Sequence, residues 1–461
     1  MVKLSDSEIF LAVGKVIFQH NYPNEYLEKM NYYSLNGKAP EVGLEEAVVR
    51  GIAPDKGLYF PEEIKPLPAS FFENIESLSN NEIAFEAIHQ FVDGVIPDED
   101  LKDIIADVLS FDFPVVELEE NIATLELFHG PTMAFKDVGA RFMARCLGYF
   151  SAQKDAKEPV TVLVATSGDT GGAVARGFLN VEGVDVVILY PTGKVSDIQE
   201  KQLTTLGANI TALEVDGVFD DCQAMVKTAF LDEEITSKRK LTSANSINIA
   251  RWLPQLFYFL FAYKQAKSKG KELVFSVPSG NFGNICAGMV AHKLGMPVKH
   301  FVASVNRNDI VPEFLKTGVY KPKPSVATIS NAMDVGDPSN FIRIQKLFNN
   351  DLETLSQKLS SFSYDDEQTK EAMQHIYKKT GYIADPHGAV GYLGLKNYLK
   401  DHPDAYGIFL ETAHPVKFLP VVNPVIDAEI AIPPQIEEVM HKEKQATSIK
   451  NYEEFKSFLL G

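Results

Sequence analysis

The feature that most constrains the fold is an alternation of short apolar runs with helical patterns from residue 160 onward. The apolar runs are rich in β-branched residues, which is typical of strands buried on both faces. Helical spacing fills the stretches between them, such as 170–179 and 219–228. Strands separated by helices form parallel sheets, so we predict an α/β fold. The predicted strands are 162–166, 186–190, 210–215, 273–277, 300–304 and 408–411.

The first part of the chain has a different sequence pattern. Pro54, Gly57 and Pro61 interrupt it, and 72–109 has helical spacing. We therefore predict a small, mainly helical N-terminal domain over 1–114, which includes a short extension at 1–29. Within that extension, Ser5 and Glu8 have the spacing of a capping box and predict a helix start.

Composition excludes several classes of function. The formal net charge of −18 argues against a nucleic-acid partner, which requires clustered Lys and Arg. No apolar run approaches the roughly 18 residues that span a membrane. The N-terminus also lacks the pattern of a secretory signal, so we expect a cytoplasmic protein.

No metal site is predicted. The three cysteines are widely spaced, and the three loop histidines lack metal-ligand spacing. The cysteines are expected to be small core residues, and the histidines to be satisfied within their loops or bonded to a ligand. These residues are Cys146, Cys222, Cys286, His129, His387 and His414.

Lys136 is the first candidate for chemistry. It follows a Gly130-Pro131 loop and an apolar Ala134-Phe135 pair, and it opens a segment with helical spacing. A lysine whose stem lies among apolar groups can lose its proton and condense with an aldehyde. An ordinary surface lysine is the alternative for this position considered alone.

A second loop suits a phosphate. Small residues at 279–284 lie between a predicted strand and a helix, where Gly280 and Gly283 allow backbone N–H groups to approach one anion. A plain strand-to-helix turn is the alternative. A reactive lysine together with a phosphate loop is the minimum that pyridoxal phosphate requires. The expected contacts to the cofactor come from Gly280, Asn281, Phe282, Gly283 and Asn284.

Two further loops complete the predicted site. After the strand ending at Thr166, Ser167 and Thr170 supply hydroxyls beside a helix start that fits an anion such as a carboxylate. Thr412 follows the last predicted strand, where a neutral hydroxyl would leave a pyridine nitrogen unprotonated. Helix N-capping is the alternative in both loops. Arg251 could bind a phosphate through two hydrogen bonds, or it could be a surface arginine.

These motifs resemble the threonine synthase family of fold-type-II pyridoxal-phosphate enzymes. The similarity covers 128–137, 165–171, 279–284 and 412–415 and runs from near Tyr32 to the end of the chain. It implies a catalytic core over 115–461 made of two α/β lobes. It also implies Lys136 as the catalytic residue and cofactor attachment point, with Thr412 at the ring nitrogen. The substrate-binding residues that follow from the similarity and the loop chemistry are Ser167, Asp169, Thr170, Asn248 and Arg251.

The reaction implied by the resemblance converts O-phospho-L-homoserine and water into L-threonine and phosphate. A monomer or homodimer with a small-molecule substrate is expected. One departure concerns Leu35 and Asn36, which stand where the family usually has Thr and Arg. Two alternatives stay open: a related phospho-lyase that gives 2-oxobutyrate, and a non-catalytic cofactor-binding protein. A dehydrogenase is disfavoured because G-x-G-x-x-G is missing.

Overall fold

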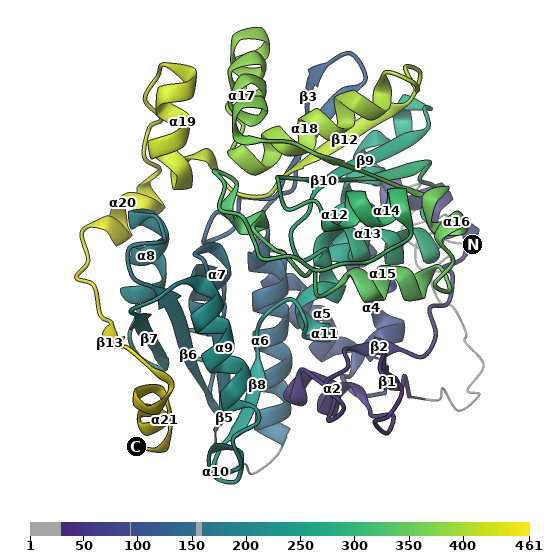
Figure 1. Ribbon diagram of the computed structural model, residues 1–461. Coiled ribbons are helices and arrows are strands. Elements are labelled where there is room, and N and C mark those ends of the chain that lie inside the picture. The colour runs from purple at the N-terminus through teal and green to yellow at the C-terminus, as the bar shows by residue number, and fades with distance from the viewer. Residues whose placement is uncertain (1–28, 93, 154–158) are drawn as a thin grey trace, which may run out of the picture.

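A computed structural model describes residues 29–92, 94–153 and 159–461 (Figure 1). Two sheets organise the chain after residue 114. One has six strands in the order β11-β10-β9-β12-β4-β3, and the other has five in the order β13-β7-β6-β5-β8. All pairs within them are parallel except β3 with β4. The fold class predicted from the alternating pattern is therefore confirmed.

The N-terminal segment is mainly helical, with one small antiparallel pair of strands. Its elements are β1 (Tyr32–Ser34), α2 (Leu44–Arg50), β2 (Tyr59–Pro61), α3 (Ala69–Asn74), α4 (Asn80–Val92) and α5 (Asp98–Val108). The helices cover most of the 72–109 stretch in which helical spacing was seen. The helix start predicted at Ser5 and Glu8 lies outside the described residues.

The six-stranded sheet collects strands from distant parts of the sequence. Its strands are β3 (Val115–Glu119), β4 (Ile122–Glu126), β9 (Leu273–Pro278), β10 (His300–Val305), β11 (Leu359–Ser363) and β12 (Tyr406–Glu411). The helices of this part are α12 (Leu256–Ala266), α13 (Gly283–Lys293), α14 (Ile310–Thr317), α15 (Phe341–Leu347), α16 (Leu352–Ser356), α17 (Asp366–Thr380), α18 (Pro386–Leu399) and α19 (Leu419–Ile426).

The five-stranded sheet comes mostly from the middle of the chain. Its strands are β5 (Val160–Ala165), β6 (Val184–Pro191), β7 (Ile210–Val215), β8 (Lys240–Ser243) and β13 (Thr447–Ile449). The accompanying helices are α7 (Asp169–Phe178), α8 (Asp197–Thr204), α9 (Phe219–Ala229), α10 (Glu233–Thr236), α11 (Ile249–Trp252), α20 (Pro434–Met440) and α21 (Tyr452–Leu460). Helix α6 (Lys136–Gln153) packs against both α5 and α7, so it joins the parts of the molecule.

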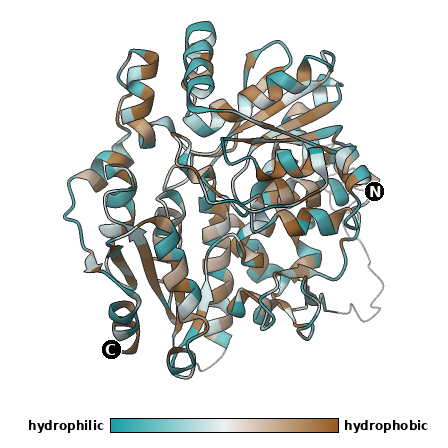
Figure 2. Cartoon of the chain, in the orientation of Figure 1, coloured by the Kyte–Doolittle hydropathy of each residue, from teal (hydrophilic) through white to brown (hydrophobic). Residues whose placement is uncertain are grey.

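One apolar core runs through all three parts. It includes Tyr59 of the N-terminal segment, Leu147 of α6, Phe275 of the larger sheet and Ile188 of the smaller one. Figure 2 shows the strands of the smaller sheet as predominantly hydrophobic, as expected when both faces are covered. Within the described residues, no helix is long and apolar enough to cross a membrane.

All six predicted strands are present with small shifts at their ends. Sequence reasoning missed β1 and β2 of the N-terminal segment and, in the two larger sheets, β3, β4, β8, β11 and β13, most of which lie at sheet edges. Edge strands are only partly covered, so they lack the continuous apolar run that identifies a buried strand. Strand β11 illustrates this, because only its first residue is buried and most of its residues are partly exposed.

Candidate active site

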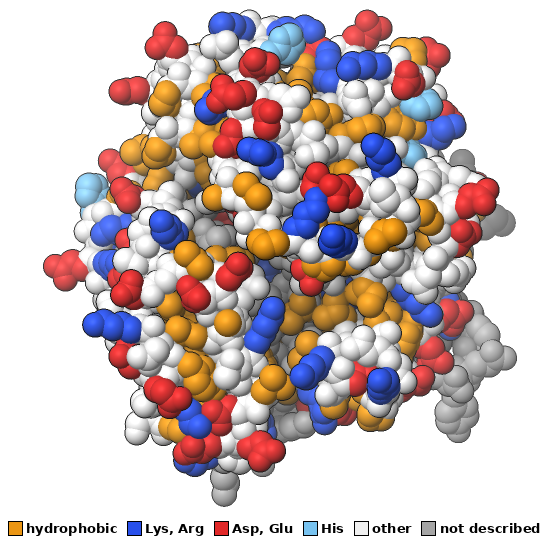
Figure 3. All heavy atoms as spheres, in the orientation of Figure 1, with side chains coloured by type: hydrophobic (Ala, Val, Ile, Leu, Met, Phe, Trp, Pro, Cys, Tyr) orange, Lys and Arg blue, Asp and Glu red, His pale blue; other side chains and the backbone are white. Residues whose placement is uncertain are grey.

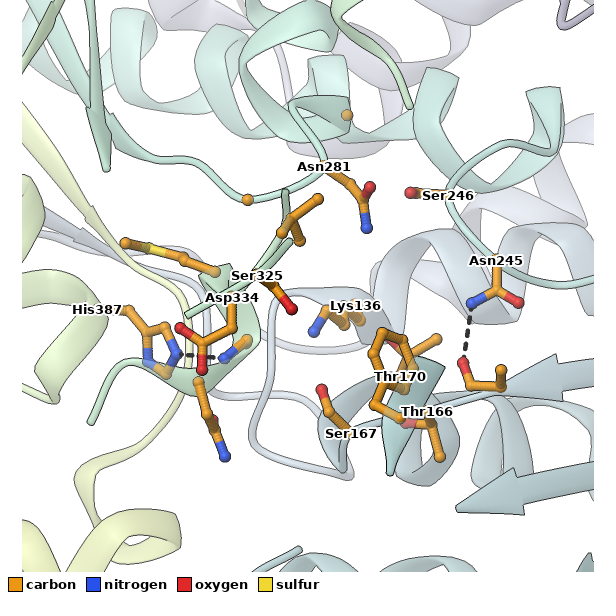
Figure 4. A pocket seen from close by; sticks show the side chains of 18 of the residues that line it. Lys136, Thr166, Ser167, Thr170, Asn245, Ser246, Asn281, Ser325, Asp334 and His387 are labelled. Carbon is orange, nitrogen blue, oxygen red and sulfur yellow. Dashed lines mark hydrogen bonds between the residues drawn. The ribbon is translucent and has the colours of Figure 1, made fainter. Parts of the chain in front are cut away.

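The carboxyl ends of strands from both sheets surround one cavity of about 600 Å³. Loops after β5, β8, β9 and β12 line it, together with the start of α6. Ligands of parallel α/β sheets bind at this edge, where loops meet helix N-termini. The predicted site loops are therefore brought together in space, and Figure 4 shows Lys136, Ser167 and Asn281 directed towards the same space.

Lys136 is the first residue of α6, and its side chain lines the cavity. Its ammonium group lies 5.5 Å from the centre of the Phe135 ring. Burial lowers the pKa of Lys136 to about 8, and the positive charges of Lys417 and Arg251 act in the same direction, while Asp169 opposes them. About a tenth of the amine is therefore unprotonated at pH 7, far more than for an ordinary lysine, as a nucleophile or a base requires.

Asp169 lies behind this amine and does not line the cavity. Its Oδ1 atom accepts a hydrogen bond from Gln199 Nε2 at 3.0 Å and lies 2.6 Å from Lys417 Nζ. Burial favours a neutral carboxyl, but the ammonium groups of Lys417 and Lys136 outweigh it and hold the pKa of Asp169 well below its usual range. Asp169 is thus a buried anion in the electrostatic surroundings of Lys136.

The 279–284 loop, predicted to bind phosphate, has an unusual backbone conformation. Phe282 precedes α13 with a φ of 62°, and this left-handed residue turns the chain into the helix. Asn284 Nδ2 donates to the carbonyl oxygen of Pro278 at 2.9 Å, which closes the loop. A Cβ atom added at Gly280 would lie 2.9 Å from both Ala332 O and Met333 Cα. Only glycine therefore fits at position 280 without displacing the opposite wall.

Thr412 lines the cavity and is tied to the loop that carries Lys136. Phe135 N donates to Thr412 O at 2.8 Å, and His414 N donates to Met133 O at 3.0 Å. Ala134 and Ala413 form an isolated antiparallel bridge. The loop before α6 and the loop after β12 are consequently one unit, which fixes Thr412 relative to Lys136.

The smaller sheet supplies the other wall. Ser167 and Thr170 line the cavity, as predicted for substrate contacts. Gly168 between them has a φ of 137°, a value that favours glycine. Asn245 and Ser246 also line the cavity, and Asn245 Nδ2 donates to Ala165 O at 3.0 Å.

Arg251 and Asn248 differ in placement. Arg251 is almost fully buried and lines the cavity, where it donates to Ala244 O and its Nε atom has no partner. Asn248 caps α11 and does not line the cavity, and its Nδ2 atom donates to Val48 O at 2.9 Å. The substrate contact predicted for Asn248 is thus not supported by its position, because its amide is used to hold α11 against the N-terminal segment.

Sequence reasoning missed Lys194 as a member of the site. It is exposed, follows β6 and lines the cavity mouth. The cationic Lys or Arg side chains of the described cavity lining are Lys136, Lys194 and Arg251. The position of Lys194 after the carboxyl end of a predicted strand could have identified it as a site residue. Leu35 and Asn36 lie outside this lining, and Asn36 Nδ2 donates to Asp55 O at 3.0 Å.

The residues fit pyridoxal phosphate. The amine of Lys136 is desolvated, the glycine loop leaves room for a phosphate at the start of α13, and Thr412 offers a hydroxyl on the same sheet. These groups can hold an aldehyde, a phosphate and a ring nitrogen respectively. Among the residues that the structure describes, no cluster of His, Cys, Asp and Glu could hold a metal ion.

Comparison with known proteins agrees with this chemistry. Residues 114–407 match the family described as pyridoxal-phosphate dependent enzyme. Residues 31–109 match the threonine synthase N terminus, and residues 388–459 match the threonine synthase C-terminal family.

Individual relatives cover nearly the whole chain. Threonine synthase of Escherichia coli (strain K12) is 43% identical over 89% of this chain and 94% of that protein. A crystal structure of threonine synthase from Escherichia coli superposes with a TM-score of 0.87 at 40% identity, covering 94% of this chain and 99% of that one. The structure of pyridoxal-phosphate-bound threonine synthase from Brucella melitensis gives a TM-score of 0.87 at 33% identity, covering 94% and 99%. The chain therefore belongs to the threonine synthase family, and pyridoxal phosphate is its cofactor.

Proposed function

We propose that the cavity converts O-phospho-L-homoserine and water into L-threonine and phosphate. The observation that carries this proposal is the presence of two separate groups of anion-binding residues around one lysine. The 280–284 loop suits the cofactor phosphate, and Asn245, Ser246 and Arg251, which follow β8, form a second group next to it. A substrate with its own phosphate requires that second group.

The cofactor would be held by residues of the larger sheet. Lys136 would be the attachment point, the backbone of 280–284 would receive the phosphate, and Thr412 would serve the ring nitrogen. When bound, pyridoxal phosphate supplies an electron sink that stabilises negative charge at substrate carbon atoms. A neutral threonine hydroxyl, in contrast to an aspartate, leaves the ring nitrogen unprotonated and moderates that sink.

Lys136 also moves protons during the reaction. When its amine is free, Lys136 would take the proton from Cα of the substrate and then act as the base at Cβ. A pKa of about 8 lets the same group act as base and as acid near neutral pH. Asp169 and Lys417 act as positioning groups, because their charges face Lys136 without lining the cavity.

Residues of the smaller sheet would hold the substrate. Arg251, Asn245 and Ser246 bind its phosphate, and Lys194 contributes positive charge at the mouth. Ser167 and Thr170 bind its carboxylate beside the start of α7. On the face shown in Figure 3, basic and acidic side chains are interspersed without a continuous basic patch, which supports a small-molecule substrate. Monomer or homodimer assembly and a cytoplasmic location stay predictions.

The decisive experiment couples purified protein, pyridoxal phosphate and O-phospho-L-homoserine to phosphate release and identifies the product by mass. Phosphate with an equal amount of threonine supports the proposal, and phosphate with 2-oxobutyrate indicates the phospho-lyase. Cofactor absorbance without any phosphate release indicates a non-catalytic cofactor-binding protein. A Lys136→Ala variant is the control, because it should remain folded and release no phosphate.

A further inference from the structure

A buried histidine at the start of α18 is not used in the reaction as derived above. His387 is 2% exposed, and Asp385, its neighbour two residues earlier, is fully buried. His387 Nδ1 lies 2.9 Å from Asp385 Oδ2. On its other side, Ala332 N donates to His387 Nε2 at 3.2 Å, as Figure 4 shows. The imidazole thus connects a carboxylate to a backbone N–H group.

These two contacts determine the tautomer of His387. Nε2 must present a lone pair in order to accept from Ala332 N–H. The proton of the neutral ring therefore lies on Nδ1, from which it is donated to Asp385. The carboxylate beside a histidine fixes ring orientation and tautomer in the same way in other enzymes.

Asp385 is itself held firmly. Its Oδ1 atom accepts from Gly388 N at 2.6 Å and caps α18, and Pro386 occupies the first turn of the helix. The carboxyl group of Glu411 lies against this turn, because a Cβ atom added at Gly388 would be 2.1 Å from Glu411 Oε1. Burial and the neighbouring charge of Asp385 raise the pKa of Glu411 well above its usual range. Glu411 is therefore neutral.

Ala332 links this arrangement to the phosphate loop. It lies in the short 3-10 helix Asn331–Met333, which is part of the cavity wall. The carbonyl oxygen of Ala332 and the Cα atom of Met333 pack directly over Gly280. The hydrogen bond from Ala332 N to His387 therefore also fixes the distance between the Asn331–Met333 turn and the 280–284 loop.

We propose that His387 is a positioning residue that holds the Asn331–Met333 turn over the phosphate loop and so shapes the seat of the cofactor phosphate. It acts through the N–H group of Ala332, and Asp385 supports it by keeping Nε2 free of a proton. The proposal rests on the proposed assignment of the 280–284 loop to the cofactor phosphate.

The test measures the dissociation constants of pyridoxal phosphate and of pyridoxal, which lacks the phosphate, by absorbance titration of the cofactor-free protein. His387→Ala removes the acceptor. In His387→Gln, the side-chain carbonyl oxygen can lie near the position of Nε2 and again accept the hydrogen bond from Ala332 N. Asp385→Asn keeps the size of the helix cap but offers an N–H group to Nδ1, which moves the ring proton to Nε2. His300→Ala is a matched control, because His300 is a buried histidine bonded to Ser360 and away from the cavity.

We expect His387→Ala and Asp385→Asn to weaken pyridoxal phosphate binding about tenfold, the effect of losing one buried hydrogen bond. His387→Gln and His300→Ala should stay within about twofold of the wild type. Pyridoxal binding should change little in every variant, because the effect acts through the phosphate loop. If His387→Ala does not fold, Asp385→Asn and His387→Gln decide the matter.

Two results would overturn the inference. Equal affinities for pyridoxal phosphate in all variants would show that the bond does not shape the phosphate seat. Equal losses for pyridoxal and pyridoxal phosphate would show that His387 supports only the general fold. A wild-type protein that binds no pyridoxal phosphate would overturn the assignment of the loop as well, so the two failures are distinguishable.

Discussion

Lys417 Nζ lies 2.6 Å from Asp169 Oδ1, and both side chains are almost completely buried. Lys417 Nζ also donates to Thr132 O at 2.9 Å, in the loop that precedes Lys136. This pair connects the 3-10 turn after β12 in the larger sheet with the start of α7 in the smaller one. Two charges that would each be costly to bury alone compensate each other behind the reactive amine.

Breaking this pair should destabilise the protein strongly. Either Asp169→Asn or Lys417→Met leaves one buried charge without its partner, at a cost of about 3–5 kcal/mol. The double variant removes both charges and should be more stable than either single variant. Urea unfolding of the cofactor-free protein measures the free energies of unfolding.

An exposed ion pair provides the control for that experiment. Lys442 and Glu438 lie 2.8 Å apart on α20 and the turn after it, and both are exposed. Their separate replacement by alanine should change the free energy of unfolding little, because solvent screens an exposed pair. If breaking the buried and the exposed pair lowered the free energy of unfolding equally, burial of the Asp169–Lys417 pair would not be the cause of the effect.

Lys136 should make stability depend on pH. Its pKa is lowered from the ordinary 10.5 to about 8 in the folded protein, so between these values the unfolded chain binds more protons. The free energy of unfolding must then rise with pH across this window, by about 3 kcal/mol from this group. Lys136→Met should lack that rise.

The measurement compares cofactor-free wild type and Lys136→Met in denaturant at several values between pH 8 and pH 10.5. Other titrating groups cancel in the difference between the two proteins. Parallel stability curves would contradict the lowered pKa of Lys136.

Gly280→Ala should weaken cofactor binding. The added methyl group would lie 2.9 Å from backbone atoms of the facing wall, which cannot move as a side-chain end can. We expect at least a tenfold increase in the dissociation constant of pyridoxal phosphate. Gly391→Ala is the matched control, because its nearest neighbour would be Pro278 Cδ at an ordinary 3.4 Å. Similar changes in both variants would contradict the steric explanation.

Arg251→Met should impair substrate binding more than cofactor binding. It removes a buried guanidinium that lines the substrate side of the cavity, and a charge-assisted bond to phosphate is worth about tenfold or more in affinity. KM for O-phospho-L-homoserine should rise by at least that factor, while the dissociation constant of pyridoxal phosphate stays within about threefold. Arg145→Met serves as the control, since Arg145 pairs with Asp107 outside the cavity lining. An unchanged KM in Arg251→Met would exclude its role in phosphate binding.

Much of this architecture could be predicted from the sequence. Buried strands such as β5 have a nearly continuous apolar pattern, and the loops after predicted strands contain the 280–284 segment and Thr412. Lys136 is identified from its Gly-Pro loop and apolar pair. Partly covered strands such as β11 gave no comparable signal.

The contacts within and behind the cavity wall could not be predicted. The partners of Asp169 and His387 come from segments distant in sequence or from backbone atoms, such as Lys417 and Ala332 N. Residue type and spacing contain no information on such pairings. Asn248, whose substrate contact stays a prediction, is a helix cap in the folded protein, and residue type alone did not indicate that role.

The two walls of the cavity are contributed by different sheets. The lysine loop, the phosphate loop and Thr412 follow strands of the six-stranded sheet, whereas Ser167, Lys194 and Ser246 follow strands of the five-stranded sheet. Under the proposed assignment, recognition of the coenzyme and choice of substrate are encoded in loops of different sheets. In evolution, replacement of the loops after β5, β6 and β8 could retarget the enzyme to a different amino acid while the chemistry of the coenzyme is inherited unchanged.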